Sequence, residues 1–366
     1  MLAERMNNLG SSKIRAMFEA AARMKNPINL SLGQPDFDVP QFIKDAAISA
    51  IQSGKNGYSV TSGIPEFRAA VKQNLMVEGV TAESEMAIAG ASGGLILALM
   101  ALADPGTDVI AADPYFVAYG NLIQFVGANP IWIDTYPTFK ITPSQLEAAV
   151  TPRSKVFLFN SPGNPTGIAY TAAEIKALAA TAKRLGLSVI SDEVYDKFCY
   201  DFPHECWLKH DPQAVLIRTF GKTWGMPGWR AGFAAGPRMV LDAMATLQQF
   251  TFVCLHTPTQ WACVEAFKHD HEPMIDSYRK KRDLVFEGLK QEYNVQKPTG
   301  TFYIFPEAPG GDGERFIKAC MEHEVLVVPG NAFSRRNSHF RVSFAASDEI
   351  LKRGVDKLLM IARQLK

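Results

Sequence analysis

The chain has 366 residues, 47% of them apolar and 20% charged, which is long enough for two globular domains. Its 38 basic and 37 acidic residues give a formal net charge of +1, so it lacks the strong positive field of a nucleic-acid-binding or membrane-surface protein. The five cysteines are odd in number and too widely spaced for a metal-ligand cluster. We therefore expect a reduced, cytoplasmic protein with no metal site and with neither nucleic acid nor membrane as partner.

The first 24 residues are charged early and have no apolar core like that of a signal peptide. A later stretch, residues 86–103, runs for 18 residues without a charge, close to the lower limit for a membrane span. Glycines at 90, 93 and 94 interrupt it. We expect it to divide into a strand, a glycine turn and a buried helix, and the chain to be soluble.

Strand and helix patterns then alternate along most of the chain. The helical pattern 171–185 is closed by Lys183, Arg184 and Gly186, as helix ends commonly are. Near-continuous apolar strands separated by helices indicate a mostly parallel sheet that is buried on both faces, an α/β fold. The predicted strands are 108–112, 130–134, 155–159, 187–191, 214–220 and 230–236.

The pattern changes after about residue 257. Two long helical segments are followed by short strands at TFYIF, VLVV and FRVSF and by a last helix capped by Ser347. In the second helix, 273–292, the basic run 279–282 reads as exposed. We expect a large domain at 46–257 and a smaller α+β domain formed by 258–366, with residues 1–45 as its N-terminal arm.

Three motifs directly follow predicted strands: SPGNPTG with Asn164, SDEVY with Asp192 and Tyr195, and GKTWG with Lys222. Ligand chemistry in parallel sheets gathers at the carboxyl ends of the strands, so these side chains should meet at one site. A lysine amine, a carboxylate and an arginine are what an enzyme needs to hold pyridoxal 5'-phosphate (PLP). They form the Schiff base, pair with the pyridinium nitrogen and neutralise the phosphate, respectively.

The order and spacing of these motifs resemble those of the class I/II aminotransferases of the aspartate aminotransferase superfamily. The resemblance runs from SLGQPDF near residue 31 to FRVSFAAS, which ends at Ser347. It implies PLP fold type I, with a large domain built on a mostly parallel sheet covered by helices and a smaller α+β domain. It also implies that Lys222 forms the internal aldimine and is the catalytic residue.

The resemblance assigns further residues to the cofactor. Asp192 pairs with the pyridinium, while Tyr195 and Asn164 reach the phenolate oxygen and Phe116 stacks on the ring. The resemblance assigns phosphate binding to the helix start at Gly90, Ala91 and Ser92, and to Thr219 and Arg230. It also implies a homodimer in which Tyr58 of the neighbouring subunit contacts the phosphate. Thr219 departs from the serine of many relatives.

On the substrate side, Arg341 matches the arginine that grips the α-carboxylate of an amino acid, with Asn164 and Gly33 beside it. The side-chain pocket is less defined. Phe37, Tyr119, Phe302 and Tyr303 are candidate lining residues, and no second cation can be identified. We expect a neutral or aromatic amino donor and a 2-oxo acid acceptor, with broad specificity open.

Each residue also has a structural interpretation. Lys222 could be a solvated loop residue, Asp192 a helix cap, and Arg341 the partner of a structural ion pair. Phe116 and Tyr58 could be packing residues, and His204, Cys199 and Cys206 read as structural.

For the whole chain, the leading function is aminotransfer between an L-amino acid and a 2-oxo acid. The alternatives are a PLP-dependent carbon–sulfur β-lyase or related lyase and, less favoured, a non-catalytic sensing module. Relatives of that last kind carry an added DNA-binding domain, for which this sequence leaves no room.

Overall fold

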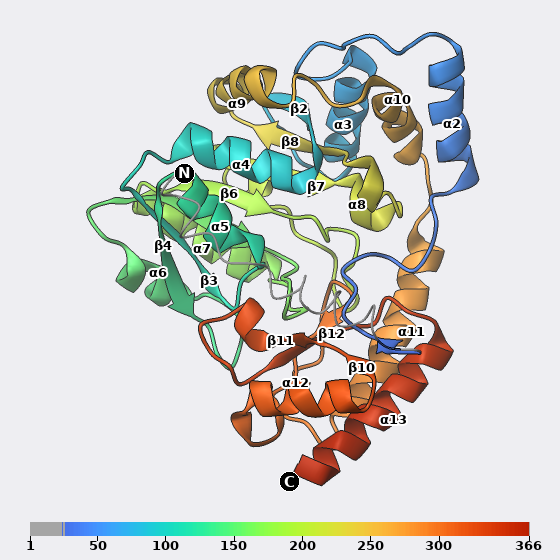
Figure 1. The fold of residues 1–366 in the computed structure, drawn as a ribbon. Helices are drawn as coiled ribbons and strands as arrows, with labels where there is room; N and C mark the ends of the chain where they lie inside the picture. The colour runs from blue at the N-terminus through green and yellow to red at the C-terminus, as the bar shows by residue number, and fades with distance from the viewer. Residues whose placement is uncertain (1–23, 25, 366) are drawn as a thin grey trace, which may run out of the picture.

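The computed structural model describes residues 24 and 26–365 (Figure 1). Its largest sheet has seven strands in the order β2-β8-β7-β6-β5-β3-β4. β8 is antiparallel to both of its neighbours, and the other adjacent pairs are parallel, so the predicted mostly parallel sheet is confirmed. The strands are β2 (Ser84–Ile88), β3 (Asp108–Asp113), β4 (Asn129–Asp134), β5 (Ser154–Asn160), β6 (Ser188–Asp192), β7 (Val215–Thr219) and β8 (Gly232–Gly236).

Helices cover both faces of this sheet (Figure 1). Because the strands are apolar on both sides, each face forms its own hydrophobic cluster with the helices above it. One face is covered by α4 (Gly90–Leu102), α5 (Ala118–Phe125) and α9 (Arg238–Thr251). The other is covered by α3 (Pro65–Val77), α6 (Pro143–Ala149), α7 (Ala172–Arg184) and α10 (Thr257–Ala266).

Helix α7 shows how local sequence sets these elements. The Thr171 hydroxyl accepts the backbone N–H of Glu174, and the Glu174 carboxylate accepts the backbone N–H of Thr171. This capping box starts the helix one residue after the predicted position. Gly186 then adopts φ +68°, a left-handed conformation that ends the helix.

The C-terminal part is the smaller α+β unit, at the bottom of Figure 1. Its sheet has the antiparallel order β11-β12-β9, and β10 pairs in parallel with β1 near the N-terminus. The elements are β1 (Ile28–Asn29), α11 (Glu272–Leu289), β9 (Tyr303–Ile304), α12 (Gly313–Glu322), β10 (Val325–Leu326), β11 (Val328–Pro329), β12 (Phe340–Ser343) and α13 (Asp348–Leu365).

One prediction for α11 is wrong. Arg282 was expected on the exposed basic face, but its side chain is 2% exposed and ion-pairs with Asp201 at 3.0 Å. The guanidinium also lies over the Tyr200 ring, 5.0 Å from its centroid. The sequence run of four basic residues spans more than one turn, so it cannot lie on a single face of the helix.

The domain boundaries at residues 45 and 257 stay a prediction, and residues 1–23 of the N-terminal arm lie outside the described structure. Helices α2 (Gln41–Gln52) and α10, which flank those boundaries, pack against each other. No helix within the described residues is long and apolar enough to cross a membrane. Residues 86–103 form β2 and the buried helix α4, as expected.

Candidate active site

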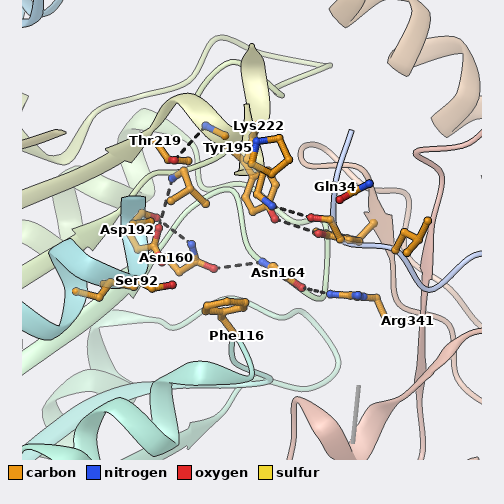
Figure 2. A pocket seen from close by; sticks show the side chains of 18 of the residues that line it. Gln34, Ser92, Phe116, Asn160, Asn164, Asp192, Tyr195, Thr219, Lys222 and Arg341 are labelled. Atoms are coloured by element: carbon orange, nitrogen blue, oxygen red, sulfur yellow. Dashed lines mark hydrogen bonds between the residues drawn. The ribbon is translucent and has the colours of Figure 1, made fainter. Parts of the chain in front are cut away.

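A cavity of about 370 Å³ lies at the carboxyl ends of the parallel strands, where the large sheet meets β12 and the segment after β1 (Figure 2). All the predicted site residues line it except Gly90 and Tyr58. β5, β6 and β7 each end at this cavity and supply Asn160, Asp192 and Thr219. The sheet topology therefore brings together residues that are far apart in the sequence.

Lys222 lies in the short helix α8 (Phe220–Thr223), directly after β7. Its ammonium donates a hydrogen bond of 2.7 Å to the carbonyl oxygen of Gly33. Burial, followed by the nearby cations Arg341 and Arg230, lowers the pKa of Lys222 to about 8. The amine is thus partly neutral near physiological pH, a state in which it can act as a nucleophile or base.

Asp192 ends β6 and is 2% exposed. Burial raises the pKa of its carboxyl to about 6, against the opposing effect of a hydrogen bond from Tyr119. The Tyr119 hydroxyl donates to Asp192 Oδ2 at 2.5 Å, and the backbone N–H of Val194 donates to Oδ1 at 3.4 Å. In the described structure this buried carboxylate has no ion-pair partner.

Asn164 is part of a hydrogen-bonded series that crosses the site (Figure 2). The Asn160 amide donates to the backbone oxygen of Asp192 at 2.9 Å, and the Asn164 backbone N–H donates to Asn160 Oδ1 at 3.2 Å. Arg341 Nη1 donates to Asn164 Oδ1 at 2.9 Å. Asn160, which the sequence reasoning missed, therefore links the strand end at Asp192 to the loop of Asn164. Its position as the last, polar residue of an apolar strand was the available signal.

Tyr195 and Phe116 complete the walls of the cavity. The Tyr195 hydroxyl lies 3.1 Å from the hydroxyl of Tyr303, and Phe116 points into the cavity from the loop before α5 (Figure 2). The ring of Phe116 meets that of Tyr119 edge to face, with centroids 5.5 Å apart. The Phe116 ring thus faces the cavity, and the Tyr119 ring packs against it.

Residues at the start of α4 and at the end of β7 form another part of the cavity wall. Gly90 has φ +69°, and a Cβ placed there would lie 2.7 Å from Arg230 Nη2, so only glycine lets the guanidinium approach this turn. Ala91 and Ser92 follow in the first turn of α4 and line the cavity. The Thr219 hydroxyl donates to the Ala231 carbonyl at 2.9 Å and accepts the Gly221 N–H at 3.1 Å.

Arg341 lies in β12 and is 3% exposed. Besides Asn164, it donates to the Ser31 carbonyl oxygen at 3.0 Å, and its buried Nε has no hydrogen-bond partner in the described structure. The guanidinium lies between the rings of Tyr303 and Phe333, 4.3 and 4.6 Å from their centroids. Among the described residues it has no carboxylate partner, unlike Arg282, so the structural ion-pair interpretation is not supported.

Three of the four residues expected to line a substrate side-chain pocket do not reach the cavity. Phe302 is fully buried, Phe37 packs edge to face on Tyr278, and Tyr119 lies behind Asp192. Only Tyr303 lines the cavity, and the cations in its described lining are Lys222, Arg230 and Arg341. Gln34, which the sequence reasoning did not single out, also lines it (Figure 2).

Two other groups of residues lie outside the cavity. Tyr58 is 88% exposed, on a surface loop before α3, so it is not a core residue of its own chain. His204 pairs with the buried Glu193 at 2.8 Å, and Glu193 also ion-pairs with Arg218 at 2.9 Å. His204 therefore has a structural contact, as expected.

A half-buried lysine, a buried carboxylate and a buried arginine at the ends of parallel strands, next to a small α+β unit, define the fold type I class of α/β enzymes. Residues 25–358 match the family model described as aminotransferase class I and II. The chain belongs to the class I and II aminotransferase family.

Individual proteins that the chain resembles are also named as aminotransferases. The chain is 35% identical over 379 residues to the probable aspartate aminotransferase of Methanocaldococcus jannaschii, with all of both chains covered. It is 31% identical to the solved aspartate aminotransferase of Thermus thermophilus, with a TM-score of 0.94 and 99% of each chain covered. The aromatic aminotransferase of Pyrococcus horikoshii is also 31% identical, with a TM-score of 0.90 and 96% and 100% covered. The chain is thus an aminotransferase, and its family and fold imply PLP as cofactor.

Proposed function

We propose that the cavity binds PLP through Lys222 and an amino acid through Arg341. The observation that carries this proposal is the charge balance of the site. In the part of the chain that the structure describes, Lys222 is a half-buried cation, Arg341 a buried cation and Asp192 a buried carboxyl group, and none of the three has an ion-pair partner. Burial of an unpaired charge is costly, so ligands that supply two anionic groups and one cationic group fit this arrangement.

The residues present fit the cofactor. Asp192 would balance a protonated pyridine nitrogen, and the Gly90 turn with Arg230 and the α4 N-terminus would hold a phosphate. Phe116 would face the ring, with Asn164 and Tyr195 beside its phenolate oxygen. When bound, the cofactor withdraws electrons from the Cα atom of the amino acid and so makes its proton acidic.

The remaining steps belong to residues of this chain. The planar fork of Arg341 would hold the α-carboxylate with two hydrogen bonds, and so fix the direction of the Cα–H bond. Lys222 Nζ, once free, would take the Cα proton and return it to the cofactor. Its lowered pKa of about 8 makes it a base of suitable strength at neutral pH. Tyr303 and Asn164 would keep Arg341 in place.

We propose a homodimer in which Tyr58 reaches the phosphate of the partner subunit. Tyr58 is exposed on the loop before α3, and two buried glutamines hold that loop to the core. Gln248 donates to the Thr61 carbonyl at 2.8 Å, and Gln260 donates to Ser59 Oγ at 2.9 Å. Met239 and Phe250 of α9 are 82% and 83% exposed, an apolar surface that a second copy would cover. The five cysteines are all free, which supports the expected cytoplasmic location.

The amino donor remains a prediction. The described lining holds no cation besides Lys222, Arg230 and Arg341, to which the cofactor and the α-carboxylate are assigned, and this supports neutral or aromatic donors. Of the four aromatic residues first considered, Tyr303 alone lines the cavity. Aspartate-named and aromatic-named relatives both resemble this chain.

A panel of twenty amino acids against several 2-oxo acids, read by mass spectrometry, tests this function. We expect a new amino acid to form from the acceptor, with 2-oxoglutarate the first acceptor to try. Pyruvate and ammonia released from cysteine conjugates, without amino transfer, would instead support the β-lyase alternative. Absence of any product with the PLP-loaded protein would favour the sensing module.

A further inference from the structure

Tyr119 makes the shortest contact that the described structure gives to the Asp192 side chain. Its hydroxyl donates to Asp192 Oδ2 at 2.5 Å, whereas the one other donor to that carboxylate among the described residues is the Val194 backbone N–H, 3.4 Å from Oδ1. Both side chains are 2% exposed. A hydrogen bond to a buried carboxylate is among the strongest that proteins form, because water cannot replace it.

The position of Tyr119 separates it from the residues that would touch the cofactor. Asp192 lines the main cavity, whereas Tyr119 is not part of that lining and instead lines a small cavity of about 30 Å³. Tyr119 lies in the first turn of α5, three residues after Phe116, and the two rings meet edge to face. The same short segment thus presents Phe116 to the cavity and a hydroxyl to the back of Asp192.

The hydrogen bond from Tyr119 bears on the protonation state of Asp192. Burial favours the neutral form of Asp192, whereas pairing with a pyridinium requires the carboxylate. A donor on Oδ2 favours the carboxylate and leaves Oδ1 available, and it restricts rotation of the carboxyl group. Tyrosine suits this task because burial raises its own pKa well above 10, so it keeps its proton.

We propose that Tyr119 is a positioning residue that keeps Asp192 ionised and oriented toward the pyridine end of the cavity, and that it thereby sets the affinity for the cofactor. This inference rests on the proposed role of Asp192. It requires no contact between Tyr119 and the cofactor, so the effect of Tyr119 must pass through the Asp192 carboxylate.

A double-mutant cycle on the full-length protein tests that dependence. The probe is pyridoxamine 5'-phosphate, which has no aldehyde and so forms no bond with Lys222, and its Kd is measured by fluorescence titration. Tyr119→Phe, Asp192→Asn and the double variant are compared with the wild type. Phenylalanine keeps the ring and its packing on Phe116, and the melting temperature of each variant checks that the fold is retained.

Loss of a charge-assisted hydrogen bond predicts that Tyr119→Phe weakens binding by about 10- to 100-fold. In the Asp192→Asn background the same substitution should change Kd by less than about threefold, because the carboxylate on which it acts is gone. Tyr293→Phe is the matched control. Its buried hydroxyl donates to the Leu358 carbonyl at 2.6 Å, outside the cavity lining, so its loss should leave Kd unchanged.

The outcomes separate this inference from the proposed function. If Asp192→Asn weakens binding and Tyr119→Phe does not, the role of Tyr119 is wrong while the role of Asp192 stands. An equal loss from Tyr119→Phe in both backgrounds would also overturn the inference, since it would indicate an effect of packing. If Asp192→Asn itself leaves Kd unchanged, the proposed role of Asp192 fails, and this inference fails with it.

Discussion

The Nζ atom of Lys222 lies 2.7 Å from the carbonyl oxygen of Gly33, 189 residues away in the sequence. This hydrogen bond joins the helix after β7 to the segment after β1, so the reactive amine lies where the large sheet meets the N-terminal segment. A carbonyl oxygen accepts a hydrogen bond from either the ammonium or the neutral amine, so it holds the amine in place without fixing its charge.

The charge of that amine should respond to Arg341. Arg341 is the largest electrostatic cause of the lowered pKa of Lys222, ahead of Arg230. Arg341→Ala should therefore raise the pKa of Lys222 from about 8 toward that of free lysine. The rate of acetylation of Lys222 in the cofactor-free protein, followed against pH by peptide mass spectrometry, measures this value. Arg363→Ala, at an exposed ion pair with Glu292, is the control and should leave it unchanged.

Asp192 should lower the stability of the cofactor-free protein at neutral pH. Its folded-state pKa, about 6, lies above the ordinary aspartate value of 3.8, so the unfolded chain loses this proton first as pH rises. The free energy of unfolding should therefore fall between about pH 4 and pH 6, by up to about 3 kcal/mol. Asp192→Asn should remove this fall, as measured by denaturant unfolding at several pH values.

Asp108 is a matched control, because its pKa is shifted in the opposite direction from that of Asp192. It begins β3 and is buried, but a hydrogen bond from Thr151 lowers the pKa of its carboxyl. Asp108→Asn should therefore destabilise the protein at neutral pH. Equal effects of the two substitutions would show that loss of packing, rather than charge, controls the result.

Sequence reasoning predicted the elements and residues that depend on local or contiguous patterns. The strand end at Asp192 could be located because an apolar run stops at a polar residue, and the parallel order then implied that the strand ends meet. The strand predicted at 214–220 ran one residue past the observed end of β7 at Thr219. The helix predicted at 171–185 from its closing Lys183, Arg184 and Gly186 is observed at Ala172–Arg184.

Other features depend on tertiary packing that no local pattern specifies. Tyr119 and Phe302 resemble pocket residues in an aromatic-rich sequence, yet α5 and the turn before β9 direct both into the core. The burial of Arg282 follows from the position of Asp201, 81 residues away. The Thr219 hydroxyl could be located, but its bond to the Ala231 carbonyl depends on the pairing of β7 with β8.

Arg341 should affect all amino-acid donors alike. Its removal eliminates the partner of the α-carboxylate, so Arg341→Ala should lower kcat/KM for every donor tested. The loss of transition-state stabilisation calculated from kcat/KM should be about 2–5 kcal/mol. Arg341→Lys should recover only part of the loss, because an ammonium cannot form the planar two-bond contact. Steady-state kinetics with several donors measures this. A loss confined to one donor would place Arg341 at the side chain instead of the α-carboxylate.

Tyr58 should act across a dimer interface. We expect Tyr58→Phe to weaken PLP binding, because the hydroxyl would no longer reach the phosphate. Complementation distinguishes a contact between subunits from one within a subunit. When Tyr58→Ala and Lys222→Ala subunits are mixed, each hybrid dimer contains one site with both residues intact, so activity should return. Persistent inactivity of hybrid dimers, verified by native mass spectrometry, would contradict the trans contact.

Lys222 is proposed to be the amine that holds the cofactor. Lys222→Ala should still bind PLP measurably through the phosphate and pyridine contacts, yet show no amino transfer. Lys197→Ala is a suitable control, because Lys197 is also half-buried but ion-pairs with Glu78 outside the cavity lining.

The most direct measurement is to treat the PLP-loaded wild-type protein with borohydride, digest it and locate the cofactor by peptide mass spectrometry. Reduction makes the bond between the lysine and the cofactor permanent. We predict the added cofactor mass on Lys222 and on no other lysine, with loss of the visible absorption band. Cofactor on a different lysine, or no covalent attachment in the loaded protein, would contradict the account.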